Sequence, residues 1–463
     1  MRSAGLRGFR RTFRSLPDVA RRSQSTAAAA LAEPLEDDLL PEPAWEWPRN
    51  PTNAPAPPAP RVHNFSSGPA QLPESVLERA RDEFMSWPDA PGQSPMCISH
   101  RDAGGPYQQM QMRCEGQLRA MLDVPDNYSV VFMQGGAHGQ FSAVPLNLLG
   151  GKPTISSVDT GFWARRAAAE MSKYAAIDWA ASADPKADLS ASAEPLDWRT
   201  VVPSQFTRMP DASTWRVADD AGFVHLCANE TIGGVELLDD PDLPALSPSS
   251  SSKPPPVVAD FTSCLLSRHV DVSKYGVLYC SGGKNLGPAG LTLALVRDDL
   301  LDGSREHPLC PSVLSYKTLS SSKPIGSIYA TPPTYGIYML SLVLDDLHAR
   351  GGLRWAAERT ARLAGLVYDA IDASGGFYTN PVEPASRSRI SVPFGVTGGG
   401  GRSPGESAEL ERRFLAEASQ AGFRHLAGHP IAGGARVSIY NGVPERSVEA
   451  LADFMYAFRR AHQ

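Results

Sequence analysis

The chain has 463 residues, of which 42% are hydrophobic and 20% charged, and its formal net charge at pH 7 is −6. This length predicts about two to four domains with a large buried core, and the composition is that of an ordinary globular protein. No run of about 18 apolar residues is present, so no membrane-spanning helix is expected, and the negative balance gives no indication of a nucleic-acid partner.

Residues 1–32 have the composition of a targeting segment rather than of a folded domain. They contain one acidic residue, Asp18, an alanine run and seven arginines, which are Arg2, Arg7, Arg10, Arg11, Arg14, Arg21 and Arg22. An arginine-rich, acid-poor segment without a compact apolar core is typical of an organellar transit peptide. We therefore expect import into the mitochondrial matrix, with a plastid as the alternative destination and a disordered basic tail as the competing interpretation.

Removal of residues 1–26 would change the formal charge of the chain from −6 to −12. An anionic substrate would then have to be bound by arginines placed in the site, because no basic surface would attract it. Residues 33–61 are acidic and rich in proline, which is typical of an extended linker. After this linker we expect a large domain over residues 62–345, whose first residues pack with a smaller C-terminal α+β domain over residues 346–463.

Helix-like and strand-like stretches alternate from residue 62 onward. Helices are predicted over residues 73–80, 107–122, 141–149, 351–374 and 444–462. Apolar runs predict buried strands over residues 128–133, 223–227, 257–260, 276–280 and 291–296. This alternation predicts an α/β fold with a mostly parallel sheet covered on both faces, in which a ligand binds at the carboxyl ends of the strands.

Two polar stretches, residues 181–195 and 247–255, are expected to be surface loops. The six cysteines are scattered and lack metal-ligand spacing, so we expect buried free thiols and no metal site. They are Cys97, Cys114, Cys227, Cys264, Cys280 and Cys310.

The most informative stretch is a small-residue loop that contains Lys284 and follows the apolar run 276–280. A lysine that attacks a carbonyl needs close backbone approach, which glycines at a strand end provide. Asp260 ends the preceding apolar run and could meet the same ligand from a neighbouring strand. A lysine and an aspartate in these places are what a pyridoxal 5′-phosphate site requires. Taken alone, Lys284 could instead be a surface lysine in a turn, and Asp260 a helix N-cap.

Further stretches in the same order strengthen this interpretation. They include Asn64-Phe65-Ser66-Ser67-Gly68-Pro69-Ala70, Ser99-His100-Arg101, Asn229-Glu230-Thr231, Lys284-Asn285-Leu286-Gly287-Pro288-Ala289-Gly290, Thr331-Pro332-Pro333-Thr334 and Gly433-Gly434-Ala435-Arg436. From about residue 62 to the C-terminus the chain resembles the phosphoserine aminotransferases, which are class V aminotransferases of fold type I.

The resemblance implies a role for each residue that matches the cofactor site of the family. Lys284 would form the Schiff base and shuttle a proton, and Asp260 would pair with the ring nitrogen. Trp163 would stack on the ring, and Thr231 would bind the ring hydroxyl. The cofactor phosphate would lie against the backbone N–H groups of Ala137 and His138, beside Gly283, with Thr331 reaching it from a second subunit of a homodimer.

For the substrate, the resemblance implies that Arg436 clamps the α-carboxylate. His100, Arg101 and His429 would bind the distal phosphate of phosphoserine or the distal carboxylate of glutamate.

The chain departs from the family pattern at four places. Gly283 stands where glutamine is usual and Ala330 where asparagine is usual, and both amides contact the cofactor phosphate in the family. The phosphate loop has Ala137-His138 in place of a third glycine and its usual neighbour, and Pro430 replaces an arginine. Each hydrogen bond to a charged group is worth about 1.5–3 kcal/mol, so these changes bear on cofactor affinity and on phosphate recognition.

The resemblance therefore implies a ping-pong transfer of the amino group from glutamate to 3-phosphohydroxypyruvate, with 2-oxoglutarate and phosphoserine as products of serine biosynthesis. Two alternatives stay open at this point. One is a class V aminotransferase of the serine:pyruvate or serine:glyoxylate type, and the other is a degenerate, non-catalytic homologue.

Overall fold

The computed structural model describes residues 61–463 except 190–197 and 242–253. The expected transit peptide and the expected linker up to residue 60 lie outside the described residues, as do residues 190–195 and 247–253 of the two expected surface loops. The first of these loops begins later than predicted. Ala181 and Ser182 belong to strand β4 (Ala176–Ser182), and Ala183 is fully buried because the chain is still packed against the protein there.

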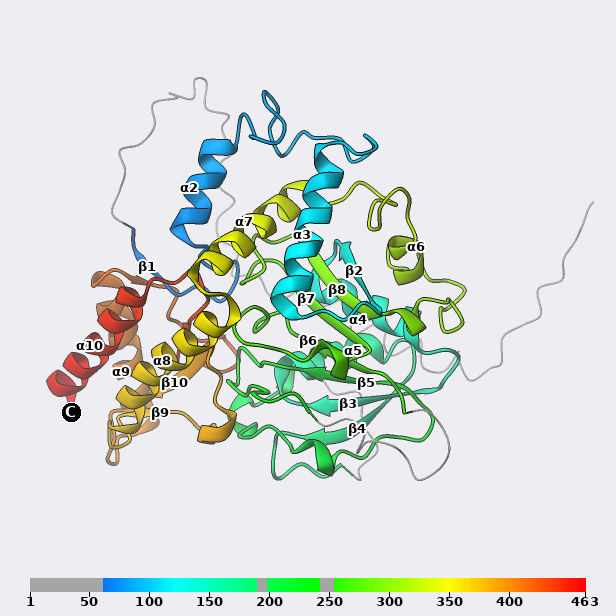
Figure 1. Cartoon of the computed structure of the whole chain (residues 1–463). Coiled ribbons are helices and arrows are strands. Elements are labelled where there is room, and N and C mark those ends of the chain that lie inside the picture. The colour runs from blue at the N-terminus through cyan, green and yellow to red at the C-terminus, as the bar shows by residue number, and fades with distance from the viewer. Residues whose placement is uncertain (1–60, 190–197, 242–253) are drawn as a thin grey trace, which may run out of the picture. The chain divides into compact units, whose positions relative to one another are not determined.

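A seven-stranded sheet forms the centre of the larger part of the fold (Figure 1). Its strand order is β2-β8-β7-β6-β5-β3-β4. The strands are β2 (Tyr128–Met133), β3 (Thr154–Asp159), β4, β5 (Ala221–Cys227), β6 (Val257–Asp260), β7 (Val277–Ser281) and β8 (Thr292–Arg297). Only β8 runs against its neighbours, β2 and β7, while the other pairs are parallel. The prediction of a mostly parallel α/β sheet is confirmed.

Helices cover both faces of this sheet, which is why its inner strands are apolar on both sides. One face packs against α3 (Pro106–Leu122) and α7 (Thr334–Arg350). The opposite face packs against α4 (Gly136–Leu148), α5 (Phe162–Met171) and α6 (Tyr316–Ser320). Every residue of β5 and β6 is buried as a result.

The C-terminal part has its own apolar cluster and its own antiparallel sheet, in the order β12-β10-β9. Its elements are α8 (Gly352–Asp372), β9 (Tyr378–Thr379), β10 (Ser391–Val396), α9 (Pro404–Gln420), β11 (Phe423–Arg424), β12 (Ala435–Ser438) and α10 (Glu445–His462). Phe65 joins this cluster because β1 (His63–Asn64) pairs with β11. The expected domain boundary at residues 345 and 346 lies inside α7, which continues to Arg350 and is capped by Gly351 at a φ of 111°.

The remaining elements are short or peripheral. They are α2 (Glu74–Glu83) and the 3-10 helices η1 (Trp198–Thr200), η2 (Pro203–Gln205), η3 (Ala212–Thr214), η5 (Val272–Lys274), η6 (Asp298–Leu300) and η7 (Pro384–Ser386).

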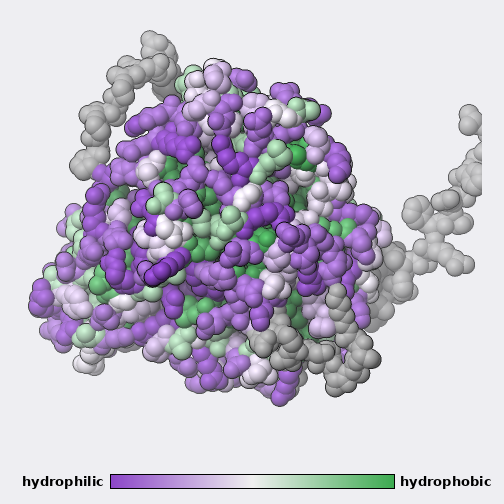
Figure 2. Space-filling view, viewed as in Figure 1, coloured by the Kyte–Doolittle hydropathy of each residue, from purple (hydrophilic) through white to green (hydrophobic). Residues whose placement is uncertain are grey.

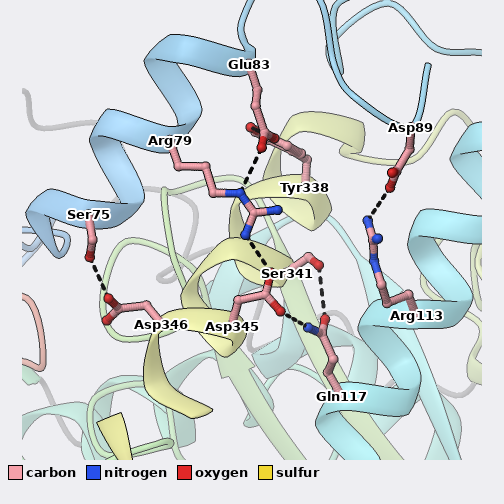
Figure 3. Close-up of polar contacts among 10 residues, drawn as sticks. All are labelled: Ser75, Arg79, Glu83, Asp89, Arg113, Gln117, Tyr338, Ser341, Asp345 and Asp346. Atoms are coloured by element: carbon pink, nitrogen blue, oxygen red, sulfur yellow. Dashed lines mark hydrogen bonds and ion pairs between the residues drawn. The ribbon is translucent and has the colours of Figure 1, made fainter. Parts of the chain in front are cut away.

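Polar contacts fasten α2 to α7 (Figure 3). Arg79 of α2 forms ion pairs with Glu83 and with Asp345 of α7, both at 2.8 Å. The Tyr338 hydroxyl of α7 donates to Glu83 at 2.8 Å, and Gln117 of α3 donates to Asp345 at 2.5 Å. These contacts hold in place both ends of the segment 84–105, which contains His100 and Arg101.

The thiol prediction is confirmed for four of the cysteines and wrong for the other two. All six are free. Cys97 is exposed and Cys310 is half-buried, because both lie in open connections rather than in strands or helices. Within the described residues, no helix is long and apolar enough to cross a membrane, and no group of acidic, histidine and cysteine side chains is arranged to hold a metal ion.

Candidate active site

A cavity of about 360 Å³ opens at the carboxyl ends of β5, β6 and β7. The loops after β2, β3, β5, β6 and β7 all reach it, which is where the sequence predicted a ligand. The cavity brings together many of the residues singled out from the sequence: Ala137, His138, Trp163, Thr231, Asp260, Gly283, Lys284, His429 and Arg436.

Lys284 lines the cavity at the turn after β7. Its backbone is held by a hydrogen bond from Gly287 N to the Lys284 carbonyl at 3.2 Å and by one from Gly283 N to the Gly287 carbonyl at 2.7 Å. The turn requires glycine at 282, because a Cβ there would lie 2.2 Å from the Pro288 carbonyl oxygen. The Lys284 amine forms no hydrogen bond or ion pair with the described residues, and its Nζ lies 5.9 Å from the centre of the Tyr440 ring. It is therefore an amine available to a ligand.

Asp260 is a buried carboxylate at the last position of β6, with 6% of its surface exposed. Its Oδ1 accepts a hydrogen bond from Thr262 N at 2.8 Å. Burial raises the pKa of Asp260, while the Thr262 hydrogen bonds and the charge of Lys284 act in the opposite direction. A cation placed against this carboxylate in the cavity would restore its charged form.

Trp163 is held by two polar contacts at the start of α5. Its indole Nε1 donates to the Thr231 hydroxyl at 2.8 Å, and its backbone N–H donates to Glu230 Oε2 at 3.0 Å. The edge-on ring of His138 lies 6.0 Å from it. Thr231 itself is almost fully buried, so the indole plane is fixed from both the backbone and the side chain.

Glu230 is a functional candidate that the sequence interpretation did not single out. It is fully buried and accepts hydrogen bonds from Trp163 N, from Ala164 N at 2.9 Å and from the Thr160 hydroxyl at 3.3 Å. Burial raises the pKa of Glu230 to about 7, and the two backbone N–H groups oppose this change. The carboxylate caps the first turn of α5, where backbone N–H groups lack helical partners. Its position inside the quoted Asn229-Glu230-Thr231 stretch was the available signal.

The first turn of α4 borders the cavity with Ala137 and His138, whose backbone N–H groups lie where helices bind anions. Gly135 precedes this turn with a φ of 101°. The His138 Nε2 accepts a hydrogen bond from Arg166 Nε at 2.9 Å, so the imidazole proton lies on Nδ1. Burial and the charge of Arg166 lower the pKa of His138.

Arg436, on β12, enters the cavity from the C-terminal part. Its guanidinium donates to the Thr231 carbonyl at 3.0 Å and to the Ser67 hydroxyl at 2.7 Å. It forms no ion pair with the described residues, and burial lowers its pKa. A partly buried guanidinium without an acidic partner is suited to a carboxylate ligand. The neighbouring His429 accepts from Ile431 N on Nδ1 at 3.3 Å, which leaves Nε2–H as a donor.

Three predicted site residues lie outside this cavity in the single chain. His100 is half-buried, with its ring edge-on to Tyr107 at 6.2 Å, and Arg101 is exposed. Thr331 is exposed and lines a different cavity, where its carbonyl accepts a hydrogen bond from Gln134 Nε2 at 2.9 Å. Their roles remain predictions.

Residues 62–451 match the family model of the class-V aminotransferases. The chain is 42% identical over 404 residues to the phosphoserine aminotransferase of Ralstonia nicotianae, covering 86% of this chain and 96% of that protein. The crystal structure of the phosphoserine aminotransferase from Bacillus circulans is 37% identical, with a TM-score of 0.74 over 87% of this chain and 99% of its own. The chain belongs to the phosphoserine aminotransferase family.

A pyridoxal phosphate-bound phosphoserine aminotransferase from Trichomonas vaginalis is also similar, at 29% identity with a TM-score of 0.71 over 86% of this chain and 100% of that one. The residues of this family member fit the same cofactor. An unpaired amine at Lys284, a buried carboxylate at Asp260, an oriented indole at Trp163 and a helix N-terminus at Ala137 form the donor set that a phosphorylated pyridine aldehyde needs.

Gly283, which stands where glutamine is usual in the family, has a backbone conformation that favours glycine. Its φ is 93°, a backbone conformation that residues with a side chain rarely adopt. Glycine therefore suits the turn as it is formed in this protein, and a glutamine there would be strained.

Proposed function

We propose that this chain transfers the amino group of glutamate to 3-phosphohydroxypyruvate, with pyridoxal 5′-phosphate as cofactor, and so forms phosphoserine and 2-oxoglutarate for serine biosynthesis. The observation that carries the proposal is the single cavity in which Lys284, Asp260 and Arg436 meet. The near full-length similarity to phosphoserine aminotransferases supports the same reaction.

When bound, the cofactor supplies an electron sink that acidifies the α-carbon of an amino acid and stores its amino group between the two half-reactions. Lys284 would hold the cofactor and, once free, would move the proton at the substrate Cα. The Asp260 carboxylate would accept a hydrogen bond from the ring nitrogen and favour its protonated form. Trp163 would cover the ring face, and Thr231, which anchors the Trp163 indole, would bind the ring hydroxyl.

The phosphate of the cofactor is assigned to the first turn of α4, at Ala137 and His138, beside Gly283. Arg436 binds the α-carboxylate of the substrate, because its two protein contacts leave the rest of the guanidinium facing the cavity. His429 donates from Nε2–H to the distal group of the substrate.

The proposal includes a homodimer in which His100, Arg101 and Thr331 complete the site of the other subunit. Large apolar side chains are exposed in the segments of these residues, Met85 at 77% and Tyr329 at 55%, and in the connection before α6, Leu309 at 80%. Hydrophobic residues are set among hydrophilic ones on the face of the chain seen in Figure 2. Exposed apolar side chains that gather in one patch mark a protein contact, and we propose that these residues belong to the contact between the two subunits. Co-expression of Lys284→Ala with Arg101→Ala chains should give hybrid dimers with restored activity, and independent subunits would give none.

We also propose import into the mitochondrial matrix, with a plastid as the alternative, on the composition of residues 1–32. A fluorescent protein that carries residues 1–60 should enter the organelle. Replacement of the seven arginines by glutamine should abolish entry, and unchanged entry would contradict the proposal.

The reaction is tested with the full chain loaded with pyridoxal 5′-phosphate. Glutamate should convert the visible absorption of the cofactor to that of its aminated form, and 3-phosphohydroxypyruvate should restore it. Lys284→Ala should abolish both conversions, whereas Lys186→Ala, at an exposed lysine, should leave them unchanged. Restoration by unphosphorylated hydroxypyruvate or glyoxylate at equal efficiency would favour a different class V reaction, and failure to bind the cofactor would indicate a non-catalytic homologue.

A further inference from the structure

Behind Asp260, on the side of the sheet covered by α4, α5 and α6, lie two buried polar residues that the proposed reaction does not use. Tyr279 of β7 is the register partner of Asp260 on β6, and both side chains therefore point to the same face. The Tyr279 hydroxyl lies 2.9 Å from His225 Nε2, on β5. Both residues are completely buried, so every polar atom in this group must find its partner within the protein.

Burial raises the pKa of Asp260, and the neighbouring Tyr279 hydroxyl is among the groups that lower it. Asp260 faces Thr262 of its own loop, Lys284 across the cavity and Tyr279 from the next strand. Burial raises the pKa of the Tyr279 hydroxyl well above its ordinary value, so Tyr279 retains its proton beside the carboxylate. Within this group Tyr279 can donate one hydrogen bond only, either to His225 or to Asp260.

The state of His225 decides between these two arrangements. Burial lowers the pKa of His225 to about 3, so its imidazole is neutral and carries one proton. Its Nδ1 has no hydrogen-bond partner among the described residues. If Tyr279 donated to Nε2, the imidazole proton would lie on Nδ1 as a buried donor without an acceptor, which native proteins rarely contain. The proton therefore belongs on Nε2, which donates to the Tyr279 oxygen.

We infer that Tyr279, oriented by the His225 Nε2–H, is a positioning residue that donates its hydroxyl proton to Asp260 and holds this carboxylate ionised toward the ring nitrogen of the cofactor. The three residues form a chain of donors that runs from His225 through Tyr279 to Asp260. Tyr279 favours the charged form of Asp260 without adding a competing cation, so the carboxylate can still pair with a protonated ring nitrogen. This inference rests on the proposed role of Asp260.

The test uses the full-length apoprotein and two probes, pyridoxal 5′-phosphate and its 1-deaza analogue, in which carbon replaces the ring nitrogen. Tyr279→Phe removes one oxygen and keeps the packed ring. A hydrogen bond to a charged group corresponds to roughly tenfold or more in affinity, so the dissociation constant for pyridoxal 5′-phosphate should rise by about tenfold. The deaza analogue has no ring nitrogen to recognise, so its affinity should change by less than about twofold.

Tyr316→Phe is the matched control, because Tyr316 is a buried tyrosine on the same face whose hydroxyl donates to Gln140 at 2.7 Å. It should lower the affinity for both probes equally or not at all. His225→Phe should act like Tyr279→Phe with a smaller effect, because the Tyr279 hydroxyl then keeps its proton but loses the group that orients it.

Equal losses for both probes in Tyr279→Phe, or no loss for either, would overturn the inference. Asp260→Asn separates this failure from that of the proposed function. If Asp260→Asn discriminates between the probes and Tyr279→Phe does not, only the positioning role fails. If neither variant discriminates, the assignment of Asp260 to the ring nitrogen is itself wrong.

Discussion

Replacement of Glu230 by glutamine tests the conclusion that a buried carboxylate fixes the first turn of α5 and, through it, Trp163. Glu230 Oε1 accepts from Ala164 N and Thr160, and Oε2 accepts from Trp163 N. An amide has one oxygen only, so its NH₂ group must face one of these backbone donors. A buried donor without an acceptor costs about 1–3 kcal/mol, and Glu230→Gln should lower the stability by this amount at acidic pH.

The difference in stability between wild type and Glu230→Gln should decrease as the pH rises. The folded pKa of Glu230 is raised to about 7 from an ordinary value of 4.5. The folded state therefore binds more protons between these values, and wild-type stability is fully present below pH 4.5 and falls as the pH rises through 7. Between pH 5 and pH 8 the advantage of wild type over Glu230→Gln should shrink by about 2.5 kcal/mol, because glutamine does not titrate.

The assay is urea unfolding of the apoproteins at pH 5 and pH 8, at one protein concentration, followed by far-ultraviolet circular dichroism. Contributions from titratable groups distant from Glu230 are common to both proteins and largely cancel in the comparison. Glu417→Gln is a control of opposite sign, because the hydrogen bond with Arg413 lowers the pKa of the half-buried Glu417 carboxyl. If the difference between wild type and Glu230→Gln is the same at both pH values, the reasoning about Glu230 is refuted.

Two further variants examine other contacts of the cavity. Arg436→Lys replaces a planar guanidinium, which donates to Thr231 and Ser67, by a single ammonium group. The KM for glutamate should rise about 10- to 100-fold with a smaller change in kcat. The control Arg413→Lys on α9 should change neither value. An unaltered KM in Arg436→Lys would show that Arg436 does not bind the carboxylate. Gly161→Ala would place a Cβ 3.0 Å from Glu230 Cδ at a φ of 145°. Gly161→Ala should lower the free energy of unfolding by about 1–3 kcal/mol. The control Gly116→Ala, in an open position of α3, should be neutral or slightly stabilising. Equal effects of the two substitutions would contradict the predicted clash.

Local sequence was sufficient for the strands that lead to the site. Strands β2 and β6 have the predicted bounds, and β5 and β7 differ by one or two residues. An apolar run that ends in a loop of small or polar residues indicates a buried parallel strand, because a strand buried on both faces must be apolar throughout. Strands β3 and β4 were not predicted, since Ser156, Ser157 and Asp178 interrupt their apolar character.

The sequence by itself determined the reaction chemistry, because Lys284, Asp260 and Arg436 stand in family motifs and the carboxyl ends of parallel strands must meet at one edge. Tertiary structure decided which groups control these residues. Glu230 and the pair of Tyr279 and His225 have ordinary sequence surroundings, and their significance arises only from burial and from partners far along the chain. The burial and the hydrogen-bond partners of a polar side chain decide whether it holds or releases its proton, and both are set by the tertiary fold.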